Sequence, residues 1–251
     1  CDINMGNQIT ELEYDEQLIS GAKDSGILAF VGDGAQPYLY QTGLRAVQEA
    51  QGHAGAIFKP RKNQQDIIMR LQDAKKCNTK IVGIDIDAAA FVTMKMIGQE
   101  VTTKTVDELK ELVDATDIPF CVKGVLSAGD ALCAIDAGVK YIIVSNHGGR
   151  ITPNQPSSIS VLPEIKKAVG NKAKLILDGG IRSGEDIFKA LALGADYCMI
   201  GRPFTTAVLG GGRNAVKLLV EKYTAELQKI MLLTGAATIQ DITADMVSII
   251  K

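Results

Sequence analysis

Two stretches decide the fold: Val122-Lys123-Gly124-Val125, and further along the chain Tyr141-Ile142-Ile143-Val144-Ser145-Asn146-His147-Gly148-Gly149-Arg150. Each begins as a short apolar, β-branched run, which is typical of a buried parallel strand. Each then changes to polar residues and glycine. In barrels of parallel strands, the carboxyl ends of the strands carry the chemistry. We therefore expect Lys123, His147 and Arg150 to share one mouth.

Similar units of strand, loop and helix recur along the chain, which indicates an α/β fold of the (β/α)8 TIM-barrel type in a single domain, residues 1–251. Seven strands are expected, near 26–31, 56–60, 80–87, 120–125, 141–145, 174–178 and 197–200. The expected helices are 11–25, 37–51, 63–77, 105–115, 127–137, 161–169, 185–193 and 214–233, with a loop at 148–160, a short helix within 88–98 and another after Thr243. A doubly wound sheet could also use seven strands, but the glycine-rich strand ends near the C-terminus favour a barrel.

Composition excludes several classes of protein. The 251 residues carry a net charge of -2, and the basic residues are scattered, so no nucleic-acid partner is expected. No apolar run is long enough to span a bilayer. The cysteines are odd in number, widely spaced and without a CxxC pair, which favours reduced, mostly buried thiols in a cytoplasmic protein. The chain begins with Cys1 and not with Met, the pattern of a fragment or a processed form.

A phosphate site is expected where the last two strands end. Asp178-Gly179-Gly180-Ile181-Arg182 and Gly201-Arg202 place glycine beside arginine at both ends. Glycines let backbone N–H groups approach a phosphate, and the N-terminus of the following helix favours the anion. The alternative is that these glycines only make tight turns.

The other candidates lie on the neighbouring strand ends. His147 suits a general base, since an imidazole titrates near neutral pH, although it could be a structural loop residue. Arg150 can hold a carboxylate with two hydrogen bonds, or it could be an ordinary surface arginine. Lys123 needs an anionic partner if buried, such as a reduced flavin or a phosphate. Asp85 and Asp87 share one face of a strand and could share a proton, bind a ribityl chain or hold a metal, but no His or Cys close in sequence completes a metal site.

These motifs, extended by Ser183–Ala195 and by Pro203-Phe204, resemble the FMN-dependent α-hydroxy-acid oxidases and dehydrogenases, a family that includes glycolate and lactate oxidases. The motifs are specific between residues 120 and 210 and weaker before residue 100. The resemblance implies an FMN oxidoreductase that converts a small 2-hydroxy acid to the 2-keto acid, in a soluble protein that could form homo-oligomers.

The resemblance also implies roles for single residues. It makes His147 the base that takes a proton as hydride leaves Cα for flavin N5, Arg150 the carboxylate anchor, and Asp87 the support of the imidazolium. Lys123 would contact the N1/O2 side of the flavin. The remaining cofactor contacts expected are Ser145, Asp85, Asp178, Gly179, Gly180, Arg182, Gly201 and Arg202.

The chain departs from the family pattern in four places. Lys59 stands where the family has a catalytic Tyr, Asp85 where it has a Thr beside the flavin, and Met94 where it has a second carboxylate-binding Arg. The family's first barrel strand precedes anything in this chain, so we expect the one strand missing from the eight to be the N-terminal strand.

Two alternatives stay open at this point. One is a barrel that binds a phosphorylated substrate without flavin, as in phosphate-handling isomerases or inosine-monophosphate dehydrogenases. The latter need a catalytic Cys in a loop after a strand, and no Cys here is expected in such a loop. The other is a non-catalytic remnant that binds a partner chain.

Overall fold

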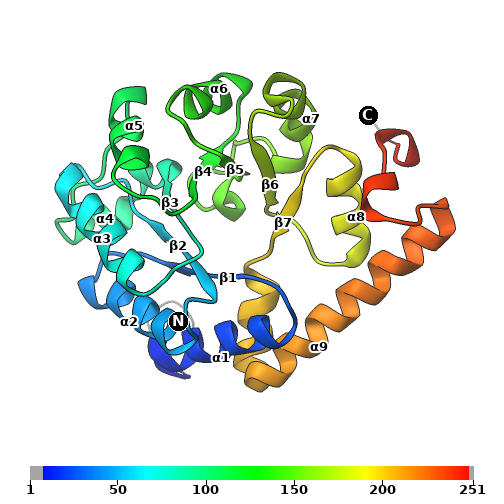
Figure 1. Cartoon of the computed structure of the whole chain (residues 1–251), viewed down its shortest axis with the longest axis horizontal. Helices are drawn as coiled ribbons and strands as arrows, with labels where there is room; N and C mark the ends of the chain where they lie inside the picture. Colours follow the sequence, from blue (N-terminus) through cyan, green and yellow to red (C-terminus); the bar gives the residue numbers. More distant parts are fainter. Residues whose placement is uncertain (1–7, 249–251) are drawn as a thin grey trace.

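The computed structural model describes residues 8–248 as a ring of parallel strands with helices outside it (Figure 1). Each strand pairs in parallel with the next in chain order. The predicted barrel architecture and its seven strands are thus confirmed, with strand bounds that agree to within a few residues. The strands are β1 (Ala29–Gly32), β2 (Ala54–Phe58), β3 (Ile81–Asp85), β4 (Phe120–Val125), β5 (Tyr141–Val144), β6 (Lys174–Asp178) and β7 (Tyr197–Met199).

The helices follow the strands as the hydrophobic spacing predicts. They are α1 (Glu11–Asp24), α2 (Pro37–Glu49), α3 (Gln64–Lys76), α4 (Val92–Met96), α5 (Val106–Asp114), α6 (Ala128–Asp136), α7 (Ser158–Val169), α8 (Gly184–Ala192) and α9 (Arg202–Thr234), with short 3-10 turns η1 (Ile86–Ala90), η2 (His147–Gly149), η3 (Ile239–Asp241) and η4 (Ala244–Met246). A capping box of Thr105 and Glu108 starts α5, as its sequence indicates.

Two helix predictions were wrong in their starts. The predicted loop 148–160 is shorter, since α7 begins at Ser158. The C-terminal helix begins at Arg202, directly after Gly201, and bends at Gly211 and Gly212, where the backbone leaves helical geometry. The three successive glycines concealed the first part of this helix from the sequence pattern, because glycine is a poor helix former.

The sheet of the described residues has two ends, and no pairing joins β7 to β1. Helices α1 and α9 pack on each other beside this gap, in a cluster that includes Val216 and Leu18. The contact is close because Gly21 has no side chain: a Cβ there would lie 2.6 Å from Cβ of Val216.

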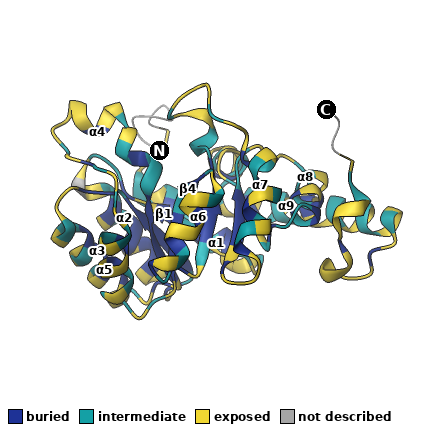
Figure 2. Ribbon diagram, turned by 90° about the horizontal axis from the view of Figure 1, so that it is seen from above, coloured by how far each residue is buried: buried dark blue, intermediate teal, exposed yellow. Residues whose placement is uncertain are grey.

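The strands form the buried centre of the molecule (Figure 2). β2 and β3 are buried along their whole length, as expected for parallel strands covered on both faces. Most of their side chains join the large core beneath the helices, while a second cluster fills the inside of the ring with Ile57, Ile81, Cys121, Ile143 and Ile176. Within residues 8–248, no helix has both the length and the apolar character needed to cross a membrane.

Candidate active site

A cavity of about 1070 Å³ runs through the ring between the carboxyl ends and the amino ends of the strands and extends along the gap between β7 and β1. Lys123, His147 and Arg150 line it, as do Asp178, Gly179, Gly180, Arg182, Gly201 and Arg202. The structure therefore brings most of the sequence-predicted site residues to one cavity. Ser145, Asp85 and Asp87 lie behind these residues and bind to them.

His147 is held in place through its backbone and its ring. It lies in η2 with a φ of 55°, a left-handed conformation that is uncommon for a residue with a side chain. Its backbone N–H donates to Ser145 Oγ at 3.0 Å, and the Ser145 hydroxyl donates to Asp178 Oδ2 at 2.6 Å. Its Nδ1 lies 3.0 Å from Asp87 Oδ1. A proton on Nδ1 satisfies that contact and leaves Nε2 as the ring's free acceptor.

Asp87 reaches the imidazole although it lies beyond the strand, in η1, and not on the strand face shared with Asp85 that the two-residue spacing predicted. Gly124 makes the approach possible. A Cβ at Gly124 would lie 2.6 Å from Cγ of Asp87, and its φ of 98° also favours glycine. Sequence reasoning quoted Gly124 in a motif but did not assign it this role.

Asp85 ends β3 and is surrounded by positive groups. Its Oδ2 accepts from Lys59 Nζ at 2.8 Å, and its Oδ1 lies 3.4 Å from Lys123 Nζ. Oδ1 is also 3.5 Å from Nδ1 of His147. Lys59 was seen in the sequence only as a departure from the family, and its pairing with Asp85 was not predicted.

The charges of this cluster shift one another's proton affinities. Burial would raise the pKa of Asp85, but the hydrogen bond from His147 and the ammoniums of Lys59 and Lys123 hold that pKa well below its usual value. Burial and the Asp85 charge raise the pKa of Asp87. Burial favours the neutral ring of His147, yet its contacts with Asp85 and Asp87 outweigh burial and raise its pKa. Of the two acids, Asp85 therefore has the lower pKa and keeps its negative charge to lower pH.

Lys123 lies in β4, and its side chain is 12% exposed. Burial would lower its pKa, but Asp85 and Asp178 raise it, so the ammonium persists. The sequence predicted a flavin or a phosphate as its anionic partner. Within this chain the partners are Asp85 and Asp178, whose Oδ2 lies 3.7 Å from Nζ.

The two strand ends that combine glycine with arginine, residues 178–182 and 201–202, line the cavity and together form the glycine-arginine cradle. Gly179 and Gly180 have φ angles of 106° and 82°, which glycine adopts without strain. A Cβ at Gly180 or at Gly201 would meet nothing within 4 Å, so both backbones face open space. Gly201 precedes the first turn of α9, where unpaired N–H groups favour an anion. Arg202 extends toward the His147 loop, since a Cβ at Gly148 would lie 3.2 Å from its Nη2.

Arg150 completes the mouth beside an aromatic ring. Its Cζ lies 5.6 Å from the centroid of Phe91, Lys59 Nζ lies 4.9 Å from it, and the His147 ring meets Phe91 edge to face at 4.7 Å. Among residues 8–248, Arg150 forms no ion pair with a carboxylate, so its guanidinium is available to an acid. Met94, at the family's second arginine position, is buried in α4.

The same cluster contains residue types that bind metal ions in proteins. Asp85, Asp87 and His147 offer ligand atoms within 4.8 Å of one another. However, Lys59 and Lys123 already contact the two oxygens of Asp85, so the cluster is an ion-pair network.

The cysteines of the described residues show no catalytic placement. Cys121 and Cys198 lie within strands, and burial raises the pKa of each thiol to about 12. Cys77 and Cys133 lie at the end of α3 and within α6, and all four are free thiols. The prediction that the cysteines are mostly buried was wrong, because among these four only Cys121 is buried and Cys133, on a helix surface, is exposed. Cys1 lies outside the described residues. The loop cysteine needed by inosine-monophosphate dehydrogenases is thus not found between residues 8 and 248.

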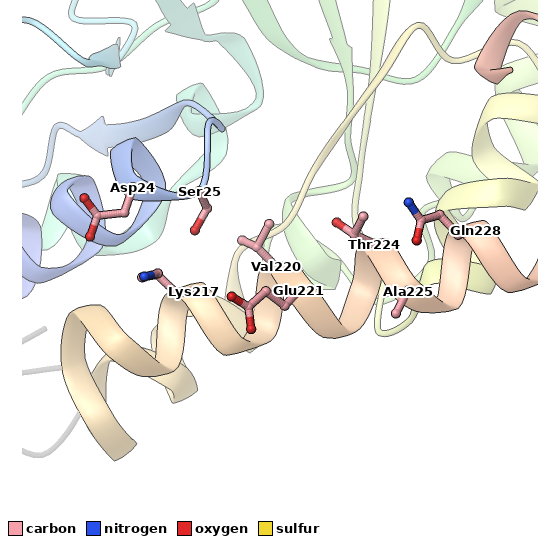
Figure 3. A pocket seen from close by; sticks show the side chains of 8 residues that line it. All are labelled: Asp24, Ser25, Lys217, Val220, Glu221, Thr224, Ala225 and Gln228. Carbon is pink, nitrogen blue, oxygen red and sulfur yellow. The ribbon is translucent and has the colours of Figure 1, made fainter.

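A second hollow of about 310 Å³ lies between the end of α1 and the middle of α9 (Figure 3). It lies beside the segment that enters β1, away from the carboxyl ends of the strands. The side chains that line it include two acids, one lysine, and amide and hydroxyl groups, but no His, Cys or Arg. Of these two hollows in the described part of the chain, the larger one is therefore the candidate site.

Comparison with known families accounts for this arrangement. A family model described as FMN-dependent dehydrogenase matches residues 45–249. The chain belongs to the FMN-dependent dehydrogenase family. Its match to a peroxisomal (S)-2-hydroxyacid oxidase of Arabidopsis thaliana is 44% identical over 140 residues, 56% of this chain and 39% of that protein. Its match to an L-lactate oxidase of Lactobacillus jensenii is 40% identical and covers 65% of this chain and 40% of the relative.

Solved structures of the FMN-dependent dehydrogenase family agree with the fold. A lactate oxidase of Pediococcus acidilactici superposes with a TM-score of 0.80 at 30% identity, over 91% of this chain and 69% of that one. A mandelate oxidase variant gives 0.79 at 25% identity, over 92% and 73%. The sequence matches to the two curated relatives, in contrast, cover about two fifths of each relative's length.

The residues present fit the family's cofactor. A flavin mononucleotide needs a phosphate site, a positive charge near the ring and a cavity of sufficient size. The open backbone at Gly180 and Gly201 with Arg182 and Arg202 offers the first, and the Lys123 ammonium offers the second. Both line the same cavity, so the family's cofactor suits this chain.

Proposed function

We propose that this chain binds FMN at the carboxyl ends of its strands and oxidises a small 2-hydroxy acid to the 2-keto acid. The observation that carries the proposal is the His147 imidazole, held by Asp87 through Nδ1 at a cavity that also holds the Arg150 guanidinium and the glycine-arginine cradle. Membership of the FMN-dependent dehydrogenase family supports the reaction class.

The residues divide the work between cofactor and substrate. The amides around Gly180 and Gly201, with Arg182 and Arg202, hold the phosphate. Lys123 supplies positive charge beside the flavin ring. FMN, when bound, supplies the N5 position that accepts the hydride from the substrate Cα.

Three other residues, Arg150, His147 and Asp87, act on the substrate. Arg150 binds the carboxylate and thereby fixes the orientation of the hydroxyl group. Nε2 of His147 accepts the hydroxyl proton as the hydride leaves. Asp87 stabilises the imidazolium that forms and holds the ring through Nδ1.

Flavin binding is tested by titrating FMN-free protein with FMN and following flavin fluorescence. Arg202→Ala should weaken FMN binding by about tenfold to a hundredfold, the value of one charge-assisted contact. Arg45→Ala, a surface change on α2 whose side chain is 65% exposed, is the control. Equal FMN affinity in the two variants would remove the phosphate assignment.

Catalysis is tested by anaerobic stopped-flow mixing of FMN-loaded protein with a panel of 2-hydroxy acids. His147→Ala should slow flavin reduction by about 10²–10⁴-fold. If an acid bleaches the flavin equally fast in both proteins, the histidine is not the base. If no acid bleaches the wild type, the oxidase proposal fails, and a phosphate-binding or non-catalytic barrel replaces it.

A further inference from the structure

The ring nitrogen Nδ1 of His147 faces two carboxylates. Asp87 Oδ1 lies at 3.0 Å and Asp85 Oδ1 at 3.5 Å. The side chains of both acids are at least nine-tenths buried, so water screens neither contact effectively. One carboxylate is enough to fix the tautomer, so the second has a further effect on the ring.

Asp85 differs from Asp87 in its own surroundings. Lys59 and Lys123 each contact one of its oxygens, at 2.8 and 3.4 Å. Asp87 has no lysine within ion-pair distance among the described residues, and its Oδ2 is buried without a hydrogen-bond partner. Asp87 is therefore the acid that takes up a proton first, whereas Asp85 keeps its negative charge.

We propose that Asp85 is a second positioning residue for His147, and that Lys59 and Lys123 hold it ionised for this role. Asp87 makes the shorter hydrogen bond and sets the direction of the ring. Asp85 supplies the lasting charge that favours the imidazolium after Nε2 has accepted a proton. The catalytic part of this inference rests on the proposed function, but the effect on the imidazole does not.

Other charged groups near the His147 imidazole either favour or oppose its protonation. Lys123 Nζ lies 3.5 Å from Nδ1 and opposes a positive ring. Arg150 Cζ lies 5.6 Å from the centroid of the Phe91 ring, which also contacts the imidazole, and its charge likewise opposes a positive ring. Lys59 lies behind Asp85, and Asp178 reaches His147 only through Ser145 and Lys123. Of the acids in the cluster, only Asp85 and Asp87 contact the imidazole directly.

The protein offers a direct measurement because it has only two histidines, His53 and His147. We would label histidine with ¹³C and ¹⁵N and follow both rings by NMR against pH, in FMN-loaded and FMN-free protein. His53 bonds to the backbone carbonyl of Ile27, outside the cluster, and serves as the internal control. The variants are Asp85→Asn, Asp87→Asn and, as the matched acid without ring contact, Asp178→Asn.

Asp85→Asn should move the His147 titration midpoint to lower pH, clearly further than Asp178→Asn does, with His53 unchanged. An Asp85→Asn midpoint equal to that of the wild type would overturn the proposal. If Asp85→Asn does not fold, Lys59→Met/Asp85→Asn removes the buried pair together. It should move the midpoint in the same direction, because Asp85 is the nearer of the two charges to the ring.

Kinetics separates this inference from the proposed function. With an active acid, Asp85→Asn should move the acid limb of flavin reduction to lower pH and reduce its plateau by about tenfold to a hundredfold. A merely structural role would lower the rate at every pH and leave the limb in place, which would also overturn the proposal. If no acid reduces the flavin in any variant, the proposed function fails, and the NMR midpoint alone decides the role of Asp85.

Discussion

Removing Lys59 and Asp85 together should cost less stability than the sum of the two single removals. The side chains are 12% and 5% exposed, and Nζ and Oδ2 lie 2.8 Å apart. Loss of one partner from such a pair leaves a buried charge and costs about 3–5 kcal/mol. Asp85→Asn should lie in that range, because it also takes a partner from Lys123. Lys59→Met should cost less, since Lys123 and His147 still face Asp85.

The double variant Lys59→Met/Asp85→Asn removes both charges, and Lys123 keeps Asp178 at 3.7 Å. We therefore expect a coupling free energy of about 2–3 kcal/mol between the two sites. Urea unfolding of all four proteins without FMN, followed by circular dichroism, gives the cycle, provided that the m-value stays constant.

The matched control is the Arg45–Glu49 pair on α2. Its atoms are also close, at 2.9 Å, but the two side chains are 65% and 47% exposed. Solvent screens such a pair, and its cycle should be additive within error. A Lys59–Asp85 coupling as small as that of Arg45–Glu49 would refute the reasoning that burial makes this ion pair important.

Three further predictions concern the cavity. Gly124→Ala places a methyl group against Asp87, so it should displace Asp87 from the imidazole and slow flavin reduction. The control is Gly98→Ala, which is also at positive φ but has open space around it and should not slow flavin reduction. Equal rates of flavin reduction in the two variants would contradict the role of Gly124. Arg150→Lys keeps the charge but loses the planar fork, so the KM for the acid should rise while FMN affinity stays constant, as separate titrations would show. The pKa of His147 is raised above its ordinary 6.5, so the imidazole loses its proton only as the pH rises through this raised pKa. We therefore expect kcat/KM to increase with pH above 6.5, and a kcat/KM profile that is flat above pH 6.5 would exclude His147 as the base.

Much of the fold followed from local patterns. Runs such as Tyr141–Val144 are typical of strands buried in a parallel sheet, and several strands are followed by a helix that begins at a polar cap, as at Asn63, Thr105 and Ser127. Such signals lie within one segment, so sequence alone contains them. The start of α9 could not be predicted, because three glycines interrupt the helical pattern and the backbone leaves helical geometry at two of them.

The site was predictable where it lies on the barrel's strand ends. Lys123, His147 and Arg150 were expected together because neighbouring parallel strands end at one edge. The partners of those residues were harder to predict. Asp87 reaches His147 from a 3-10 turn, through space that exists only because Gly124 lacks a side chain. Contacts of this kind depend on the distance between separate segments, which no single segment encodes.

Two departures from the family pattern explain each other. A lysine at 59 without an acid nearby would add an uncompensated charge to a buried site. With Asp85 beside it, the two residues that depart from the expected family pattern make one ion pair. Neither residue belongs to the glycine-arginine cradle, whereas Asp85 Oδ1 lies 3.5 Å from Nδ1 of His147. The pair therefore adds charge beside the imidazole and stays clear of the phosphate cradle.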